Sequence, residues 1–230
     1  RAALRADPWA PPSPTGRGHS AAMIDYLRDP AEITRRSFDT VRAECDLSSL
    51  TPAQAELAVR LVHACGMTDI LGDLSWGGAV AEAGAAALKA VAPVLCDARM
   101  VAEGITHTFL PSDNEILCPL NDEGVAERAR GDGTTRSAAA VDHWRPHLQG
   151  AVVAIGNAPT ALFRLIEILQ DGAPRPAAIL AFPVGFIGAA ESKEALIEAQ
   201  LGVPFVTLRG RRGGSALAAA AVNALALSAT

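Results

Sequence analysis

The chain has 230 residues, of which 50 % are hydrophobic, 20 % are charged and only 4 % are aromatic. Such a composition excludes a disordered chain and indicates a globular protein whose core is built mainly from Ala, Val, Leu and Ile. The formal net charge of −5 argues against a nucleic-acid or anionic-membrane surface that covers the whole molecule, so an anionic ligand must be held by a few placed cations.

The first 22 residues differ in composition from the rest. They contain four prolines, three arginines and one aspartate, with neither the apolar core of a signal peptide nor a helical period. We predict a disordered leader or cloning remnant over residues 1–22 and a single α/β domain over residues 23–230. The leader carries a net charge of +2, which leaves −7 for the domain.

The next part of the chain predicts helices. Apolar and charged residues alternate with helical spacing over residues 29–44, and Asp29-Pro30 is a typical helix start. A second helix is predicted from the N-cap Thr51 and Pro52 to a stop at Gly66. A third, rich in Gly and Ala, is predicted over residues 77–90.

Beyond residue 92, short apolar runs alternate with helical patterns. We predict strands at 93–96, 115–118, 151–155, 177–181 and 204–208, and helices near 135–145, 158–170, 190–199 and 214–227. Continuously apolar strands that alternate with helices are typical of a parallel sheet covered on both faces. The predicted fold class is therefore α/β, with a doubly wound, mostly parallel sheet that is preceded by N-terminal helices.

Ligand sites in such folds lie at the carboxyl ends of the strands, and the turns predicted there are rich in glycine. Glycines allow a ligand to approach the backbone, and a following helix offers free N–H groups to an anion. Four such turns favour a large anionic ligand, although Gly and Pro also punctuate ordinary loops.

Common cofactor and metal motifs are absent from the sequence. There is no P-loop motif, and the glycines after the last predicted strand lack dinucleotide-binding spacing. Pro146 interrupts the pair His143 and His147, which lacks a third metal ligand. We expect no cofactor, no metal, no nucleic acid and no membrane partner.

The cysteines and the apolar runs bear on the compartment. None of the four cysteines forms a CxxC pair, so a disulfide framework and a zinc ribbon are both disfavoured. No apolar run approaches the roughly 20 residues needed to cross a bilayer. The cytoplasm is the expected location.

His63 is placed in the last turn of the second predicted helix, three residues after Arg60 and on the same face. The helix C-terminus favours a protonated ring and the arginine opposes it, so the imidazole can exchange a proton near neutral pH. The pattern alone favours a structural histidine over a catalytic one.

The assembled segments resemble the precorrin-8X methylmutases of cobalamin biosynthesis, also called precorrin isomerases, from Tyr26 to about Leu225. The resemblance is carried by residues 26–30, 36–38, 62–66, 96–106, 135–139, 154–162, 183–193 and 209–215.

That resemblance implies an isomerase that moves a methyl group from C-11 to C-12 of precorrin-8X and gives hydrogenobyrinic acid. It implies that His63 is the catalytic acid and that Ser37, Thr106 and Arg136 contact the substrate. It also implies a homodimer with the site at the interface, and hand-over of the product to the next enzyme is a further expectation.

The residue chemistry extends this set of substrate-binding candidates. Arginines suit the many carboxylates of the substrate, because their planar guanidinium groups bind carboxylates in pairs of hydrogen bonds. The additional candidates are Arg36, Arg60, Ser137, Asn157, Thr160, Arg209 and Arg212.

Three alternatives remain open at this stage. Instead of a precorrin-8X methylmutase, the chain could be a cobalt-precorrin-8 methylmutase of the anaerobic route or a non-catalytic corrinoid-binding or channelling protein. The third alternative is another α/β enzyme that binds a small phosphorylated or carboxylated metabolite. A binder would have no need of an acid at His63.

Overall fold

The computed structural model describes residues 24–229, so the leader predicted for residues 1–22 lies outside the described residues. The helices are α1 (Pro30–Glu44), α2 (Pro52–Cys65), α3 (Val80–Lys89), α4 (Arg99–Gly104), α5 (Val125–Gly131), α6 (Arg136–Val141), α7 (Pro159–Gln170), α8 (Ala189–Glu198) and α9 (Ser215–Ala229). The strands are β1 (Leu74–Gly77), β2 (Val94–Cys96), β3 (Ile116–Leu117), β4 (Val152–Ile155), β5 (Ala178–Ala181) and β6 (Phe205–Leu208). Short 3-10 helices are η1 (Thr68–Asp73), η2 (His107–Phe109), η3 (Pro119–Asn121) and η4 (Asp142–His147).

The strands form one sheet in the order β1-β6-β5-β4-β2-β3. The five strands from β2 to β6 are parallel to their neighbours, and β1 pairs antiparallel with β6 at one edge. The chain goes from β2 to β3 on one side and then returns to β4 on the other side of β2, so the winding direction reverses between β2 and β4. The predicted doubly wound, mostly parallel sheet is confirmed.

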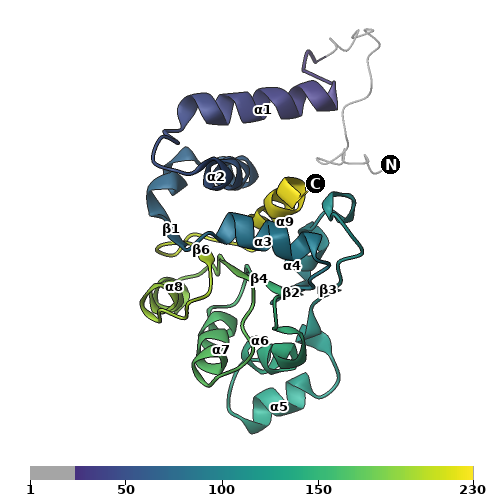
Figure 1. The fold of residues 1–230 in the computed structure, drawn as a ribbon, viewed down its shortest axis with the longest axis vertical. Coiled ribbons are helices and arrows are strands. Elements are labelled where there is room, and N and C mark those ends of the chain that lie inside the picture. The colour runs from purple at the N-terminus through teal and green to yellow at the C-terminus, as the bar shows by residue number, and fades with distance from the viewer. Residues whose placement is uncertain (1–23, 230) are drawn as a thin grey trace, which may run out of the picture.

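Helices cover both faces of the sheet, and each face has its own apolar cluster (Figure 1). Helices α3, α4 and α9 lie on one face with α2 outside them, and α6, α7 and α8 lie on the other. Alternate strand residues point to opposite faces, so Val94 belongs to one cluster and Leu95 to the other. Helix α9 is apolar almost all round because α2, α3, α4 and the sheet enclose it.

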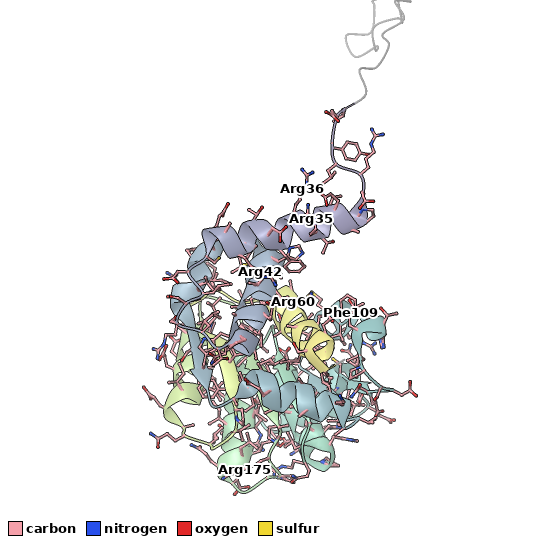
Figure 2. The ribbon with its side chains drawn as sticks, turned by 45° about the horizontal axis from the view of Figure 1, so that its top comes forward. Arg35, Arg36, Arg42, Arg60, Phe109 and Arg175 are labelled. Atoms are coloured by element: carbon pink, nitrogen blue, oxygen red, sulfur yellow. The ribbon has the colours of Figure 1, made fainter. Side chains whose placement is uncertain are left out.

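Helix α1 forms an outer layer over α2 (Figure 1). Its N-cap Asp29 accepts a hydrogen bond from the Glu32 N–H at 2.7 Å, as the predicted helix start requires. Val41 is the one buried side chain of this helix. Figure 2 shows that the N-terminal half of α1, with Arg35 and Arg36, extends beyond the rest of the protein.

Helix α2 has the predicted boundaries. Thr51 and Gln54 form a capping box at its start, and Gly66 ends it in the left-handed conformation with φ of 69°. The cap places His63 in the last turn of a helix whose inner face, including Leu57, Val59 and Leu61, is buried.

The structure corrects the predicted elements in three places. The third helix begins at Val80 and not at residue 77, because residues 74–77 form strand β1. The helix predicted over 135–145 ends at Val141 and continues as the 3-10 helix η4, which contains Pro146. Helices α4 and α5 were not predicted. None of the described helices has both the length and the hydropathy that a bilayer span requires.

Candidate functional site

His63 lies on the outer side of α2 and faces α1. The Ser37 Oγ on α1 is 2.8 Å from the His63 Nδ1, and the Phe38 ring packs against the imidazole with 4.7 Å between ring centroids. Nδ1 is thus held by a hydroxyl group, which leaves Nε2 for a ligand. The imidazole remains exposed to solvent, and the structure places it in contact with Ser37.

Arg60 belongs to the same cluster. Its guanidinium carbon lies 5.0 Å from the centroid of the Phe38 ring, so Arg60 and His63 share a helix face as predicted. Burial lowers the pKa of Arg60 below its usual value. Arg36 instead pairs with Glu32 within α1 at 2.6 Å, so its guanidinium is partly neutralised.

Thr106 precedes η2 on the same side of the sheet as α9. Its backbone N–H donates to the Asn223 Oδ1 at 2.9 Å, and the Asn223 amide donates to the Gly104 carbonyl at 3.1 Å. These two bonds fix the turn after α4 against α9, and the Thr106 side chain is half-buried.

The reversal of strand order between β2 and β4 is organised by a residue that sequence analysis did not single out. Asp97 follows β2, is 2 % exposed, and accepts the backbone N–H groups of Gly156, Asn157 and Ala158 at 2.9, 2.9 and 2.7 Å. Burial raises the pKa of Asp97, against the three N–H donors that favour its charged form. A carboxylate directly after a buried strand was the signal available in the sequence.

The predicted residues Asn157, Thr160, Arg136 and Ser137 lie beyond the ends of the strands. Asn157 is exposed in the turn after β4, and Thr160 is in the first turn of α7. The Thr160 hydroxyl is 2.8 Å from the Thr135 hydroxyl, which also caps α6. This contact brings together the starts of α6 and α7, so Arg136 is exposed beside them.

The arginines after β6 are largely engaged within the chain. Arg209 pairs with Glu194 at 2.7 Å, and Arg212 pairs with Asp69 at 2.7 Å and Asp73 at 2.6 Å. These carboxylates raise the pKa of Arg212 and occupy its guanidinium. Arg211, which was not predicted, forms no ion pair within residues 24–229 and lies over the Phe186 ring.

The predicted residues therefore form separate groups. His63, Ser37, Arg36 and Arg60 belong to α1 and α2, which are outside one face of the sheet, whereas Arg136 and Ser137 belong to α6 on the other face (Figure 1). Asn157, Thr160 and the arginines after β6 lie at the carboxyl edge between these layers.

A cavity of about 490 Å³ lies near β3, and none of the predicted residues lines it, although His107, the neighbour of Thr106, does. His143 and His147 line it together with the buried Trp144. Within residues 24–229, no group of three or more His, Cys, Asp or Glu side chains is arranged to hold a metal ion.

Comparisons with known proteins identify the family of the chain. The family profile described as precorrin-8X methylmutase matches residues 32–228. The chain is 59 % identical over 204 residues to the precorrin-8X methylmutase of Pseudomonas aeruginosa, covering 89 % of this chain and 98 % of the relative. It is 36 % identical to the cobalt-precorrin-8 methylmutase of Methanothermobacter thermautotrophicus, covering 84 % and 91 % of the two chains.

A solved structure shares the fold. The crystal structure of the precorrin-8X methyl mutase from Thermus thermophilus superposes with a TM-score of 0.79 at 38 % identity, and the match covers 86 % of this chain and 96 % of that one. With the sheet, the helical layers and nearly the whole length matched, the chain belongs to the precorrin-8X methylmutase family.

Proposed function

We propose that this chain converts precorrin-8X into hydrogenobyrinic acid by moving one methyl group from C-11 to C-12, with His63 as the acid. The observation that carries the proposal is the 2.8 Å contact between Ser37 Oγ and His63 Nδ1 on an exposed helix end. Close relatives that carry the name precorrin-8X methylmutase support it.

The proton balance of this reaction needs one group. The protonated imidazole donates from Nε2 to a ring nitrogen of the substrate while its Nδ1–H donates to the Ser37 oxygen. The bond from the methyl group to C-11 breaks as the bond to C-12 forms, and the proton then returns to Nε2. The product is an isomer of the substrate, so no electron donor or acceptor is consumed.

The substrate carboxylates need cations near this acid. Arg136 is the exposed predicted arginine that forms no ion pair within the described part of the chain, and Arg60 is available beside Phe38. Arg36, Arg209 and Arg212 would each have to exchange a carboxylate of the protein for one of the substrate. Asn157, Thr160, Ser137 and Thr106 are the proposed uncharged hydrogen-bonding partners.

A second copy of the chain is proposed to complete the site. In one copy, the acid and Arg136 lie in layers on opposite sides of the sheet (Figure 1). The projecting half of α1 exposes Ile33 to 46 %, and Tyr26 just before it is 62 % exposed. A homodimer that covers this apolar surface brings the acid of one copy near the cationic edge of the other, which we define by Arg136 and the arginines after β6.

Of the two candidate substrates, we propose metal-free precorrin-8X and not its cobalt complex. The relatives named for precorrin-8X are 59 % and 55 % identical to this chain, whereas a relative from Priestia megaterium named for cobalt-precorrin-8 is 33 % identical. We further propose that the reaction takes place in the cytoplasm, where free thiols such as the four cysteines of this chain persist. We also propose that the product is handed over to the next enzyme of the route.

The test is His63→Ala compared with His147→Ala, a histidine outside the proposed site. Incubation with precorrin-8X is followed by the change in absorbance, and binding of hydrogenobyrinic acid is titrated separately. We expect His63→Ala to lose turnover and keep binding, and His147→Ala to match the wild type.

Two outcomes contradict the proposal. Turnover by His63→Ala at the wild-type rate would show that His63 is not the acid. Tight binding of the product by a wild-type protein that shows no turnover would identify a non-catalytic corrinoid-binding protein. Parallel incubations with precorrin-8X and cobalt-precorrin-8 decide between the substrates.

A further inference from the structure

The loop between β5 and α8 exposes large apolar side chains at the carboxyl edge of the sheet. Phe186 is 86 % exposed, Ile187 is 90 % exposed and Val184 is 43 % exposed. Strand β5 lies between β4 and β6, so this loop projects from the middle of the edge where doubly wound folds bind ligands. Apolar groups gathered at such a position indicate a binding surface.

A cation is already placed on this surface. The Arg211 guanidinium carbon is 5.4 Å from the centroid of the Phe186 ring. Its neighbours Arg209 and Arg212 are neutralised by acids of the protein, but Arg211 pairs with no carboxylate among the described residues. The surface thus combines a flat apolar ring with one positive charge that is free to meet an anion.

The backbone under this surface is fixed. The Gly185 N–H donates to the Arg211 carbonyl at 3.2 Å, and the Gly214 N–H donates to the Phe182 carbonyl at 2.8 Å. Gly213 packs so closely on the Phe182 and Pro183 carbonyls that a Cβ atom there would clash with them. The two loops therefore hold Phe186 and Arg211 in a set relation before any ligand arrives.

Lys193 holds the loop between β6 and α9, which carries Arg211. Its side chain is fully buried in α8, and its Nζ donates to the Arg212 carbonyl at 2.7 Å. The structure gives this ammonium group no ion pair within residues 24–229. A buried lysine that is used for a single loop carbonyl indicates that the position of that loop matters.

We propose that Phe186, Ile187 and Arg211 form a subsite for the substrate, in which the apolar side chains carry one face of the macrocycle and Arg211 binds a peripheral carboxylate. Lys193 is the positioning residue that holds Arg211 in place. This inference rests on the proposed function and adds the part of the site that selects a large flat ring with an acidic edge. A free cation beside an exposed ring matches that ligand better than it matches an apolar protein partner.

The test measures hydrogenobyrinic acid binding by absorbance titration for Arg211→Gln and Phe186→Ala. The matched controls are Arg175→Gln, an exposed arginine at the opposite end of the molecule from α1 (Figure 2), and Val91→Ala, an exposed apolar residue before β2. We expect each test variant to raise Kd about tenfold and each control to leave Kd within about twofold of the wild type. Arg211→Gln also reduces the salt dependence of Kd, because one ion pair is lost.

Lys193→Met tests the positioning role through the split between KM and kcat. Displacement of Arg211 weakens substrate binding and leaves the acid untouched, so KM rises several-fold while kcat stays near the wild-type value. Lys89→Met, at an exposed lysine, is the control. A several-fold fall in kcat with an unchanged KM would contradict the positioning role of Lys193.

The failures of the two proposals are distinguishable. If the wild type neither binds nor converts the tetrapyrrole, the proposed function fails. If the wild type does both, and Arg211→Gln and Phe186→Ala bind as tightly as it does, only the subsite is wrong. If Phe186→Ala loses subunit association in light scattering while Arg211→Gln keeps wild-type affinity and association, the loop is a contact between copies and the subsite is wrong.

Discussion

Asp97 shows how a single buried carboxylate organises the carboxyl edge of the sheet. It lies after β2 and accepts three consecutive backbone N–H groups from the turn that follows β4. Those groups otherwise lack partners at the start of α7, so the carboxylate satisfies them and joins the two strands at which the winding direction reverses.

We therefore expect Asp97→Asn to destabilise the protein. An amide replaces one acceptor oxygen with an N–H donor that faces other donors, and a lost charged hydrogen bond in a buried site costs roughly 1–3 kcal/mol. Urea unfolding followed by circular dichroism measures the change. Asp113→Asn, at an exposed position, is the control, and equal stability of the two variants would show that the charge at Asp97 is unimportant.

At the scale of elements, the agreement between sequence and structure follows from where each signal originates. Strands β2, β4 and β5 are continuously apolar because they are buried on both faces, so composition alone indicates them. Strands β3 and β6 are also mainly apolar, although β3 is only partly buried and β6 contains Thr207. Helix α2 carries both its start signal, Thr51-Pro52, and its stop signal, Gly66, in the sequence.

The elements that were missed lack such signals. Strand β1 has the sequence Leu-Ser-Trp-Gly, is only half-buried, and depends on pairing with β6, which is far away in the chain. Helices α4 and α5 are six and seven residues long, too short for a clear period. Their existence is decided by tertiary packing that no local window contains.

The site residues likewise depend on contacts between distant parts of the chain that the sequence does not reveal. His63 and Ser37 could be paired only through the family resemblance, because the sequence does not reveal how α1 crosses α2. The free Arg211 could not be separated from the engaged Arg209 and Arg212, because their acidic partners lie in η1 and α8.

Helix α1 is the element that we expect to open most readily. It packs on α2, buries only Val41 and is otherwise held by Ser37, Phe38 and the Arg42–Glu56 ion pair. Exposed ion pairs of this kind contribute at most about 1 kcal/mol. Local opening therefore costs less here than in α9, which is enclosed by helices and sheet.

Hydrogen exchange followed by mass spectrometry checks this expectation. Amides of residues 30–44 should exchange at least about tenfold faster than those of residues 215–229 in the free protein, since a difference of 1.4 kcal/mol in opening free energy corresponds to a factor of ten. Equal protection in the two helices would show that α1 is held by contacts beyond those with α2.

At the scale of the whole molecule, the charge of the protein opposes its proposed ligand. Residues 23–230 carry a net charge of −7, and the substrate is a polyacid. Long-range repulsion slows their encounter, whereas the local arginines act only at short range. The affinity has to come from a few cations that face an unfavourable field.

This balance predicts an unusual salt response. Raising NaCl from about 20 to about 200 mM shortens the screening length to below about 10 Å and so removes the long-range repulsion first. We expect the association rate constant of hydrogenobyrinic acid, measured by stopped-flow absorbance, to rise over this range. A steady fall would mean that the local cationic edge dominates the field even at a distance.

The order of the layers along the chain allows the part of the sequence that determines substrate preference to be located. The helices with the acid, α1 and α2, are contiguous in sequence and reach the sheet through η1 and the antiparallel edge strand β1, before any parallel strand begins. The acid and the carboxylate-binding edge thus belong to separate portions of the chain. Chimeras that join residues 24–79 of this protein to the remainder of a cobalt-precorrin-8 relative would assign metal discrimination to one portion or to the other.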